Sequence, residues 1–88
     1  MTWKIEFSRK ALRDLDRMDA AQGDRVVRFL FERVARADDP RRLGKALKGA
    51  QRAFWRYRVG DWRVLVRLEH DRLVVLVVRI AHRREAYR

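Results

Sequence analysis

The chain has 88 residues, a formal net charge of +11 and no cysteine. The absence of cysteine excludes disulfide bonds and thiolate metal sites, and the longest apolar run, residues 73–78, is far shorter than the about 20 residues of a membrane-spanning helix. This length predicts a single domain, residues 1–88, with one core, and the charged amino terminus without a signal-like apolar stretch predicts a cytoplasmic protein.

The positive charge is spread along the chain, since residues 1–50 carry +5 and residues 51–88 carry +6. Of the 23 basic residues, 19 are arginine. Because guanidinium groups bind phosphate bidentately, a globular domain this basic is expected to bind nucleic acid or an acidic protein. A membrane surface is disfavoured as a partner, because the basic residues do not gather on one amphipathic helix.

The first half of the chain predicts a strand followed by two helices. Residues 2–7 alternate apolar and polar side chains, as a half-buried strand does. Ser8 and Asp19 are typical N-cap residues, and Asp19 with Gln22 has the spacing of a capping box. The second helix should end near Pro40, and the short linker predicts an αα-hairpin. The apolar positions expected to face the core are Leu12, Leu15 and Met18 in the first helix and Val27, Leu30, Phe31 and Val34 in the second.

Residues 54–67 predict a tight β-hairpin around Gly60 and Asp61, a two-residue turn signal. Such a turn makes Arg58 face Arg63, and side chains alternate between the two faces of a strand. One face of the hairpin should therefore carry Arg56, Arg58, Arg63 and Arg67. The other face should carry core residues, namely Trp55, Tyr57, Val59, Trp62, Val64 and Val66. Like charges that face each other destabilise a sheet, so the arginine face is typical of a polyanion-binding surface; a merely solvated face is the alternative.

The segments on either side of this hairpin complete the predicted domain. Residues 40–53 form a basic loop whose Lys45, Lys48 and Arg52 are expected to contact phosphates, and loops of this length are often functional. A turn near residues 70–71 leads into residues 73–80, which are apolar enough for a central strand. The order β-α-α-β-β-β predicts an α+β fold, with the helical hairpin packed on one face of a small, mainly antiparallel sheet.

These segments, in this order and spacing, resemble the RelE/ParE superfamily of toxins from bacterial toxin–antitoxin pairs. The resemblance covers nearly the whole chain and is greatest to the RelE branch. The matching motifs are Phe7-Ser8 with Ala11-Leu12 and Leu15, then Leu47-Lys48-Gly49, then Trp55-Arg56-Tyr57-Arg58-Val59-Gly60-Asp61-Trp62-Arg63, and finally His82-Arg83-Arg84-Glu85 with Tyr87. The RelE-like fold is what this resemblance implies.

The resemblance also implies an activity, the ribosome-dependent cleavage of mRNA in the decoding site. In that mechanism the ribose 2′-hydroxyl attacks the adjacent phosphorus and leaves a 2′,3′-cyclic phosphate and a 5′-hydroxyl, without a metal or another cofactor. Carried over by position, Arg56 and Arg58 match the basic pair before the turn, and Arg63 matches the phosphate-binding arginine after it. Arg83 matches the basic residue after the last strand, and Tyr87 matches the tyrosine that stacks on a base or assists proton transfer.

Proton transfer is where this sequence departs from its relatives. The strand pair is lysine in some of them, and arginine is a poor base because it stays protonated. His82 is then the best general acid or base, since its side chain titrates near neutrality, although it follows Ala81 where many relatives have glycine. A plain strand-end histidine is the alternative for His82, and packing of the tail is the alternative for Tyr87. Alanine in place of Arg63 is expected to leave the fold intact, because its side chain should point away from the core.

The resemblance implies partners as well. They are an acidic antitoxin similar to RelB, mRNA in the ribosomal decoding site and ribosomal RNA, with Arg67 and the basic loop at the RNA interface; DNA would be contacted only through the antitoxin. The alternative is a ParE-like toxin that binds DNA gyrase and cleaves nothing. Relatives on that branch generally lack the combination of arginines, histidine and carboxyl-terminal tyrosine. A degenerate toxin that only binds its antitoxin is a third interpretation.

Overall fold

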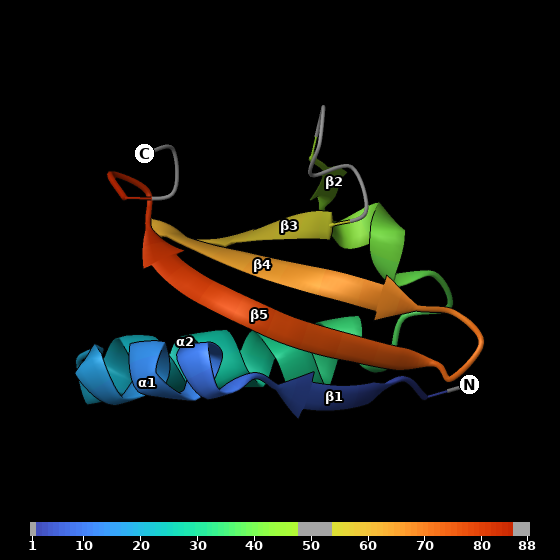
Figure 1. Ribbon diagram of the computed structural model, residues 1–88, viewed down its shortest axis with the longest axis horizontal. Helices are drawn as coiled ribbons and strands as arrows, with labels where there is room; N and C mark the ends of the chain where they lie inside the picture. The colour runs from blue at the N-terminus through green and yellow to red at the C-terminus, as the bar shows by residue number, and fades with distance from the viewer. Residues whose placement is uncertain (1, 48–53, 86–88) are drawn as a thin grey trace.

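The structure, a computed structural model, describes residues 2–47 and 54–85. These residues contain five strands and two α-helices. The elements are β1 (Lys4–Phe7), α1 (Arg9–Arg17), α2 (Ala20–Phe29), a π-helical turn (Leu30–Val34), a 3₁₀ helix (Pro40–Leu43), β2 (Lys45–Ala46), β3 (Phe54–Val59), β4 (Trp62–Glu69) and β5 (Val74–His82). The predicted order of elements is confirmed, with β2 as an additional strand (Figure 1).

The five strands form one sheet in the order β1-β5-β4-β3-β2. β1 runs parallel to β5, and the other neighbours pair antiparallel. The mainly antiparallel sheet is therefore confirmed, and so is the central position of the apolar last strand, which lies between β1 and β4. Figure 1 shows α1 and α2 together on one face of this sheet. The fold is α+β, as the order of elements predicts.

The two predicted helix starts differ in how they are capped. Ser8 caps α1 as predicted, because its hydroxyl accepts a hydrogen bond from the Ala11 N–H at 3.0 Å. Asp19 stands at the N-cap of α2, but its side chain makes no capping hydrogen bond. The predicted capping box is therefore wrong, and the first turn of α2 is closed by the backbone bond from the Gly23 N–H to the Asp19 carbonyl at 2.9 Å.

The predicted apolar stripe of the helices is confirmed in part, since Leu30, Val34 and Met18 are buried as predicted, whereas Val26 takes the place of Val27. Val26, Leu30 and Val34, spaced four residues apart, are fully buried, whereas Phe31 is 48% exposed. The π-helical turn explains part of this shift, because its backbone bond runs from the Ala35 N–H to the Leu30 carbonyl and its wider turn keeps residues four apart on one face. In α1 the buried residues are Ala11 and Asp14, followed by Met18 at the helix end, while Leu12 is 49% exposed.

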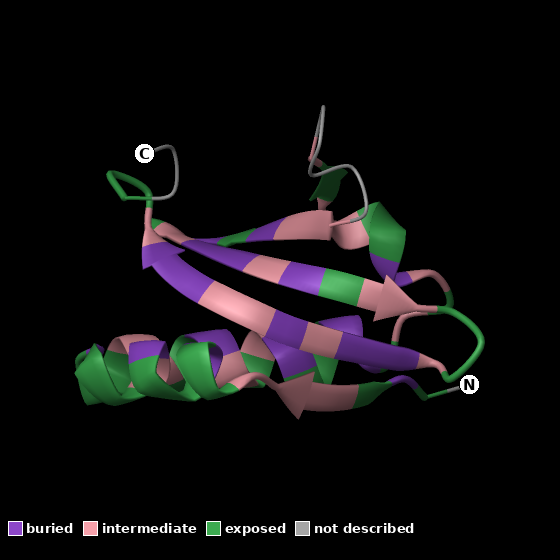
Figure 2. Ribbon diagram, in the orientation of Figure 1, coloured by how far each residue is buried: buried purple, intermediate pink, exposed green. Residues whose placement is uncertain are grey.

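The hairpin face toward the helices forms the other half of the core. Tyr57, Val59, Val64 and Val66 are buried there, and Trp55 and Trp62 are half-buried against them. This assignment was predicted from the alternation of side chains along β3 and β4 and is confirmed. Buried and more exposed residues alternate along much of the sheet in Figure 2, so the opposite face of the hairpin is free to carry polar side chains.

Candidate nucleic-acid interface

The strand register sets which arginines share the outer face of the sheet. β3 and β4 pair Arg58 with Arg63 and Arg56 with Leu65, as predicted from the two-residue turn. β5 adds a residue that the sequence reasoning missed, because Leu65 pairs in turn with Arg79. Arg79 is the one charged residue within β5 between residues 74 and 80, and this interruption of an apolar strand is the signal that could have indicated it.

The segment before the hairpin, predicted as a loop, is partly regular, so that prediction is wrong for its first half. Asp39 caps the 3₁₀ helix by accepting a hydrogen bond from the Arg41 N–H at 3.1 Å. β2 then pairs with β3, with Lys45 opposite Arg56. This pairing places Lys45 on the same face as Arg56 and next to it.

A cleft of about 240 Å³ opens between this segment and β3. Its lining residues are Arg42, Leu43, Gly44, Lys45, Arg56 and Arg58. Four of them are cationic and none is acidic, so the cleft concentrates positive charge. Arg42, Lys45 and Arg58 are exposed and Arg56 is half-buried. Three of these cations were predicted site residues, whereas Arg42 was not.

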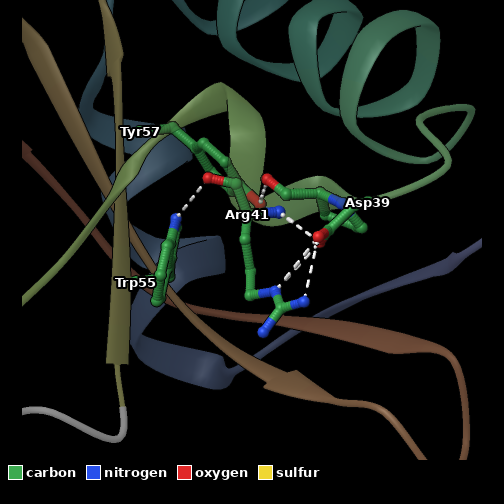
Figure 3. Close-up of polar contacts among 5 residues, drawn as sticks. Asp39, Arg41, Trp55 and Tyr57 are labelled. Carbon is green, nitrogen blue, oxygen red and sulfur yellow. Dashed lines mark hydrogen bonds and ion pairs between the residues drawn. The ribbon is translucent and has the colours of Figure 1, made fainter.

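Two aromatic side chains of β3 hold the wall of the cleft in place (Figure 3). The Tyr57 hydroxyl donates to the Pro40 carbonyl at 2.9 Å, and the Trp55 indole N–H donates to the Arg41 carbonyl at 3.1 Å. Burial raises the pKa of Tyr57, so the phenol stays protonated and able to donate. A Cβ on Gly44 would lie 2.3 Å from the Arg56 carbonyl oxygen, so only glycine allows this close approach.

The Gly60–Asp61 turn gathers a second set of cations. Arg63 is only 6% exposed, and its Nη1 donates to the Gly60 and Trp62 carbonyls, both at 3.2 Å. Arg63 lies on the predicted face, opposite the core, but it braces the turn there, which argues against the expectation that alanine in its place leaves the fold intact. The Arg83 N–H donates to the Asp61 carbonyl at 2.7 Å, with its guanidinium 3.9 Å from the Asp61 carboxylate. These contacts dock the segment after β5 onto the hairpin.

His82 lies on the other face of the sheet. Its register partner is Trp62, a residue of the core-facing side, and the two rings meet edge to face with centroids 5.5 Å apart. The imidazole Nδ1 accepts a hydrogen bond from the Arg84 N–H at 3.3 Å. The structure therefore docks Arg83 on the Gly60–Asp61 turn. It leaves the His82 ring next to Trp62, on the face opposite Arg58 and Arg63.

Comparisons with known proteins establish the family of this chain. The family model of the ParE toxin of the type II toxin–antitoxin system parDE matches residues 5–87. Toxin RelG of Mycobacterium tuberculosis is 31% identical over 88 residues, covering 100% of this chain and 99% of RelG. This chain belongs to the RelE/ParE superfamily of toxins. It is thus the toxin of a toxin–antitoxin system.

Solved structures show that the fold of this toxin is shared. The crystal structure of the toxin–antitoxin complex RelBE2 from M. tuberculosis superposes with a TM-score of 0.86 at 28% identity, covering 93% of this chain and 92% of the other. The archaeal RelE of the RelE–RelB complex from Pyrococcus horikoshii gives a TM-score of 0.75 at 21% identity, covering 98% and 100%. The predicted RelE-like fold is confirmed.

The remaining predicted residues of the toxin lie away from the cleft or outside the described part. Arg67 is exposed on the arginine face, but it pairs with Phe54 at the far end of the hairpin. Lys48, Arg52 and Tyr87 lie outside the described residues. Within residues 2–47 and 54–85, no group of three or more histidine, cysteine or acidic residues could hold a metal ion. The same residues include no helix that is long and apolar enough to cross a membrane.

Proposed function

We propose that this toxin is a ribosome-dependent endoribonuclease that cleaves mRNA. The observation that supports it is the cleft in which Arg42, Lys45, Arg56 and Arg58 converge without an acidic neighbour among its described lining residues. In this reaction the 2′-oxygen bonds to the adjacent phosphorus while the bond from phosphorus to the 5′-oxygen breaks. The products are a 2′,3′-cyclic phosphate and a 5′-hydroxyl. Guanidinium and ammonium groups around the phosphorus stabilise the charge that develops there.

Two proton transfers complete the balance, since the 2′-hydroxyl loses a proton and the 5′-oxygen gains one. Arginine cannot accept a proton at neutral pH, so we assign these transfers to His82 and Tyr87. Nδ1 of His82 is engaged by the Arg84 N–H, which leaves Nε2 for the reaction. Because the ring packs on Trp62, on the face opposite Arg56 and Arg58, this role requires the imidazole to leave the indole and reach the arginine face when the substrate binds. Neither a metal nor another cofactor is part of the proposal.

The proposed partners follow from the charge of +11. An acidic antitoxin would cover the basic surface, as strong charge complementarity favours such pairs, and the similar RelBE2 structure is a toxin–antitoxin complex. The proposed RNA partners are mRNA in the decoding site and ribosomal RNA, with DNA contacted only through the antitoxin.

The test is single-turnover cleavage of mRNA on purified ribosomes, read by primer extension. Arg58→Ala should slow cleavage about ten- to a hundredfold, because a charge-assisted hydrogen bond to the phosphate is removed. His82→Gln should slow it about a hundredfold, because a positioned proton donor or acceptor is removed. Arg13→Ala, which removes an exposed arginine of α1, is the control.

Each variant can contradict a different part of the proposal. An Arg58→Ala toxin that cleaves like the Arg13→Ala control would rule out phosphate binding in the cleft. A His82→Gln toxin with the wild-type cleavage rate would move proton transfer to Tyr87 or to the ribosome. Since Arg63 braces the turn, Arg63→Ala should lower both the cleavage rate and the melting temperature.

Inhibition of DNA gyrase is the second candidate function. It is favoured by one observation, the match of residues 5–87 to the family model of the ParE toxin. A supercoiling assay with purified gyrase separates the two candidates. Inhibition of supercoiling by this toxin, together with intact mRNA on ribosomes, would replace the nuclease proposal.

A further inference from the structure

A second basic hollow shares Arg58 with the cleft. It is a groove of about 700 Å³ between α2 and the hairpin turn. Helix α2 and the turn after it contribute Arg25, Arg28 and Arg33, and β3 contributes Arg58. Because Arg58 also lines the cleft, the two hollows meet at this one side chain.

Arg25 lies directly against the hairpin turn. Its Nη1 is 2.8 Å from the position that a Cβ on Gly60 would occupy, and Gly60 has φ +60°, in the left-handed region. The positive φ therefore favours glycine here, whereas the Arg25 guanidinium, as the end of a flexible side chain, could shift to make room for a Cβ. This arrangement brings a guanidinium from α2 to the turn that Arg63 and Arg83 also contact.

The charges in the groove are only partly balanced. Its acidic lining residues are Asp24 and Glu32. Glu32 lies 3.8 Å from Arg28, and Arg33 lies over the Phe29 ring, 5.8 Å from its centre. No ion pair joins Arg25 or Arg58 to any carboxylate within residues 2–47 and 54–85. These two guanidinium groups are available to an anion.

We propose that this groove binds RNA backbone phosphate beyond the phosphate held in the cleft, so that the strand runs from the cleft across Arg58 to Arg25 and Arg28. The inference rests on the proposed function and extends its RNA-binding surface by residues from α2. Two hollows joined through one shared arginine suit a linear polyanion, which presents successive phosphates, better than a single small anion. The ligand class is the RNA phosphodiester backbone, from mRNA or from ribosomal RNA.

The experiment compares two double variants of the whole toxin with equal net charge. Arg25→Ala/Arg28→Ala removes two exposed arginines of the groove, and Arg13→Ala/Arg36→Ala removes two exposed arginines that line neither hollow. Binding is measured to a single-stranded RNA oligonucleotide and to purified small ribosomal subunits at several salt concentrations. The groove variant should bind about tenfold more weakly than the control. Its salt slope should fall by about 0.7 for each phosphate that the variant no longer neutralises.

The two RNA probes distinguish the sources of the backbone. Weaker binding of both probes supports a groove that follows the mRNA strand, and weaker binding of the subunits alone supports ribosomal RNA. Affinities and slopes equal to those of the control variant for both probes would overturn the proposal. A loss of affinity for the antitoxin alone, with RNA binding kept, would place a protein in the groove and would overturn it as well.

The experiments distinguish a wrong groove proposal from a wrong proposed function. If the wild-type toxin binds RNA without cleaving it, the proposed nuclease activity is contradicted, and the groove proposal is still tested by the binding experiment. If the wild type cleaves mRNA and the groove variant matches the control in binding, only the groove proposal is overturned.

Discussion

The two edges of the sheet have the same gap, an unpaired end of the neighbouring strand, but differ in what lies beside it. β1 pairs with residues 74–77 of β5 and leaves the end of β5 without a partner strand. In the same way, β2 pairs only with residues 55–56 of β3 and leaves the end of β3 without one. At the β5 edge, the Ser8 hydroxyl donates to the Val78 carbonyl at 2.9 Å and Asp14 accepts from the Ile80 N–H at 2.8 Å. Side chains of the same chain thus make hydrogen bonds that a partner strand would otherwise make at this edge.

The uncovered end of β3 is bordered by the cleft and the groove, whose charged side chains are mostly arginine. Unpaired strand edges invite pairing with other chains, and native proteins block them or surround them with charge. The β5 edge is blocked by a buried acidic residue, with Asp14 8% exposed. The β3 edge is surrounded by exposed cations. We interpret the first edge as part of the stable fold and the second as the surface kept open for a polyanion.

The largest expected effect is a loss of stability when the hydrogen bond from Ile80 to Asp14 at the β5 edge is removed. Asp14→Ala leaves the buried Ile80 N–H without its acceptor, which should cost about 1–3 kcal/mol and lower the melting temperature by about 4–8 °C per kcal/mol. Asp14→Asn keeps an acceptor oxygen and should be destabilised less. Thermal melts of both variants check this, and an Asp14→Ala toxin that melts with the wild type would contradict a structural role.

A smaller effect is expected from the hydrogen bond that seats the cleft wall. Tyr57→Phe removes the hydrogen bond to the buried Pro40 carbonyl and should cost about 1 kcal/mol. Cleavage should slow too, because the 3₁₀ helix that presents Arg42 is then held less firmly. Lys45→Ala is the matched comparison, since it should slow cleavage without changing the urea unfolding midpoint. Equal midpoints for Tyr57→Phe and the wild type would show that this hydrogen bond does not hold the wall.

The hairpin could be predicted from sequence because its register depends on local chemistry. A two-residue turn at Gly60 fixes the pairing of Arg58 with Arg63, and period-two alternation then places the side chains. The cations missed by this reasoning come from elements whose positions depend on long-range contacts. Arg25 reaches the turn through packing of α2, and Arg79 reaches the arginine face through a β4–β5 pairing that contains an irregularity between residues 65 and 66.

His82 and Arg63 show the same limit at the level of single side chains. The resemblance placed both in one site, yet pairing of His82 with Trp62 rather than with Arg63 puts the imidazole on the opposite face. A shift of one residue in a strand exchanges the two faces, so a motif match along the chain could not decide this. Burial of Arg63 against the turn carbonyls likewise depends on three-dimensional packing.

The smallest expected effect on stability concerns the Asp39–Arg41 ion pair at the start of the cleft wall. Hydrogen bonds from the Arg41 side chain and backbone hold the pKa of Asp39 below its ordinary value of 3.8. Because the pKa of Asp39 is lower in the folded than in the unfolded state, its ion pair with Arg41 stabilises the fold fully at pH values above the ordinary carboxyl pKa. This stabilisation disappears as the pH falls through the folded-state value. Arg41→Ala should return the Asp39 pKa, followed by NMR titration, toward 3.8.

Arg42→Ala is the matched control for this titration, because the Arg42 side chain acts on the Asp39 carboxylate through its charge, without a hydrogen bond to it. It should move the Asp39 pKa less than Arg41→Ala does. Since the Asp39–Arg41 pair is at the surface, the difference in melting temperature between wild type and Arg41→Ala should be small at neutral pH and should shrink further in acid. An Asp39 pKa that is the same in all three proteins would show that Arg41 is not held there, and the cleft wall would then depend on Tyr57 and Trp55 alone.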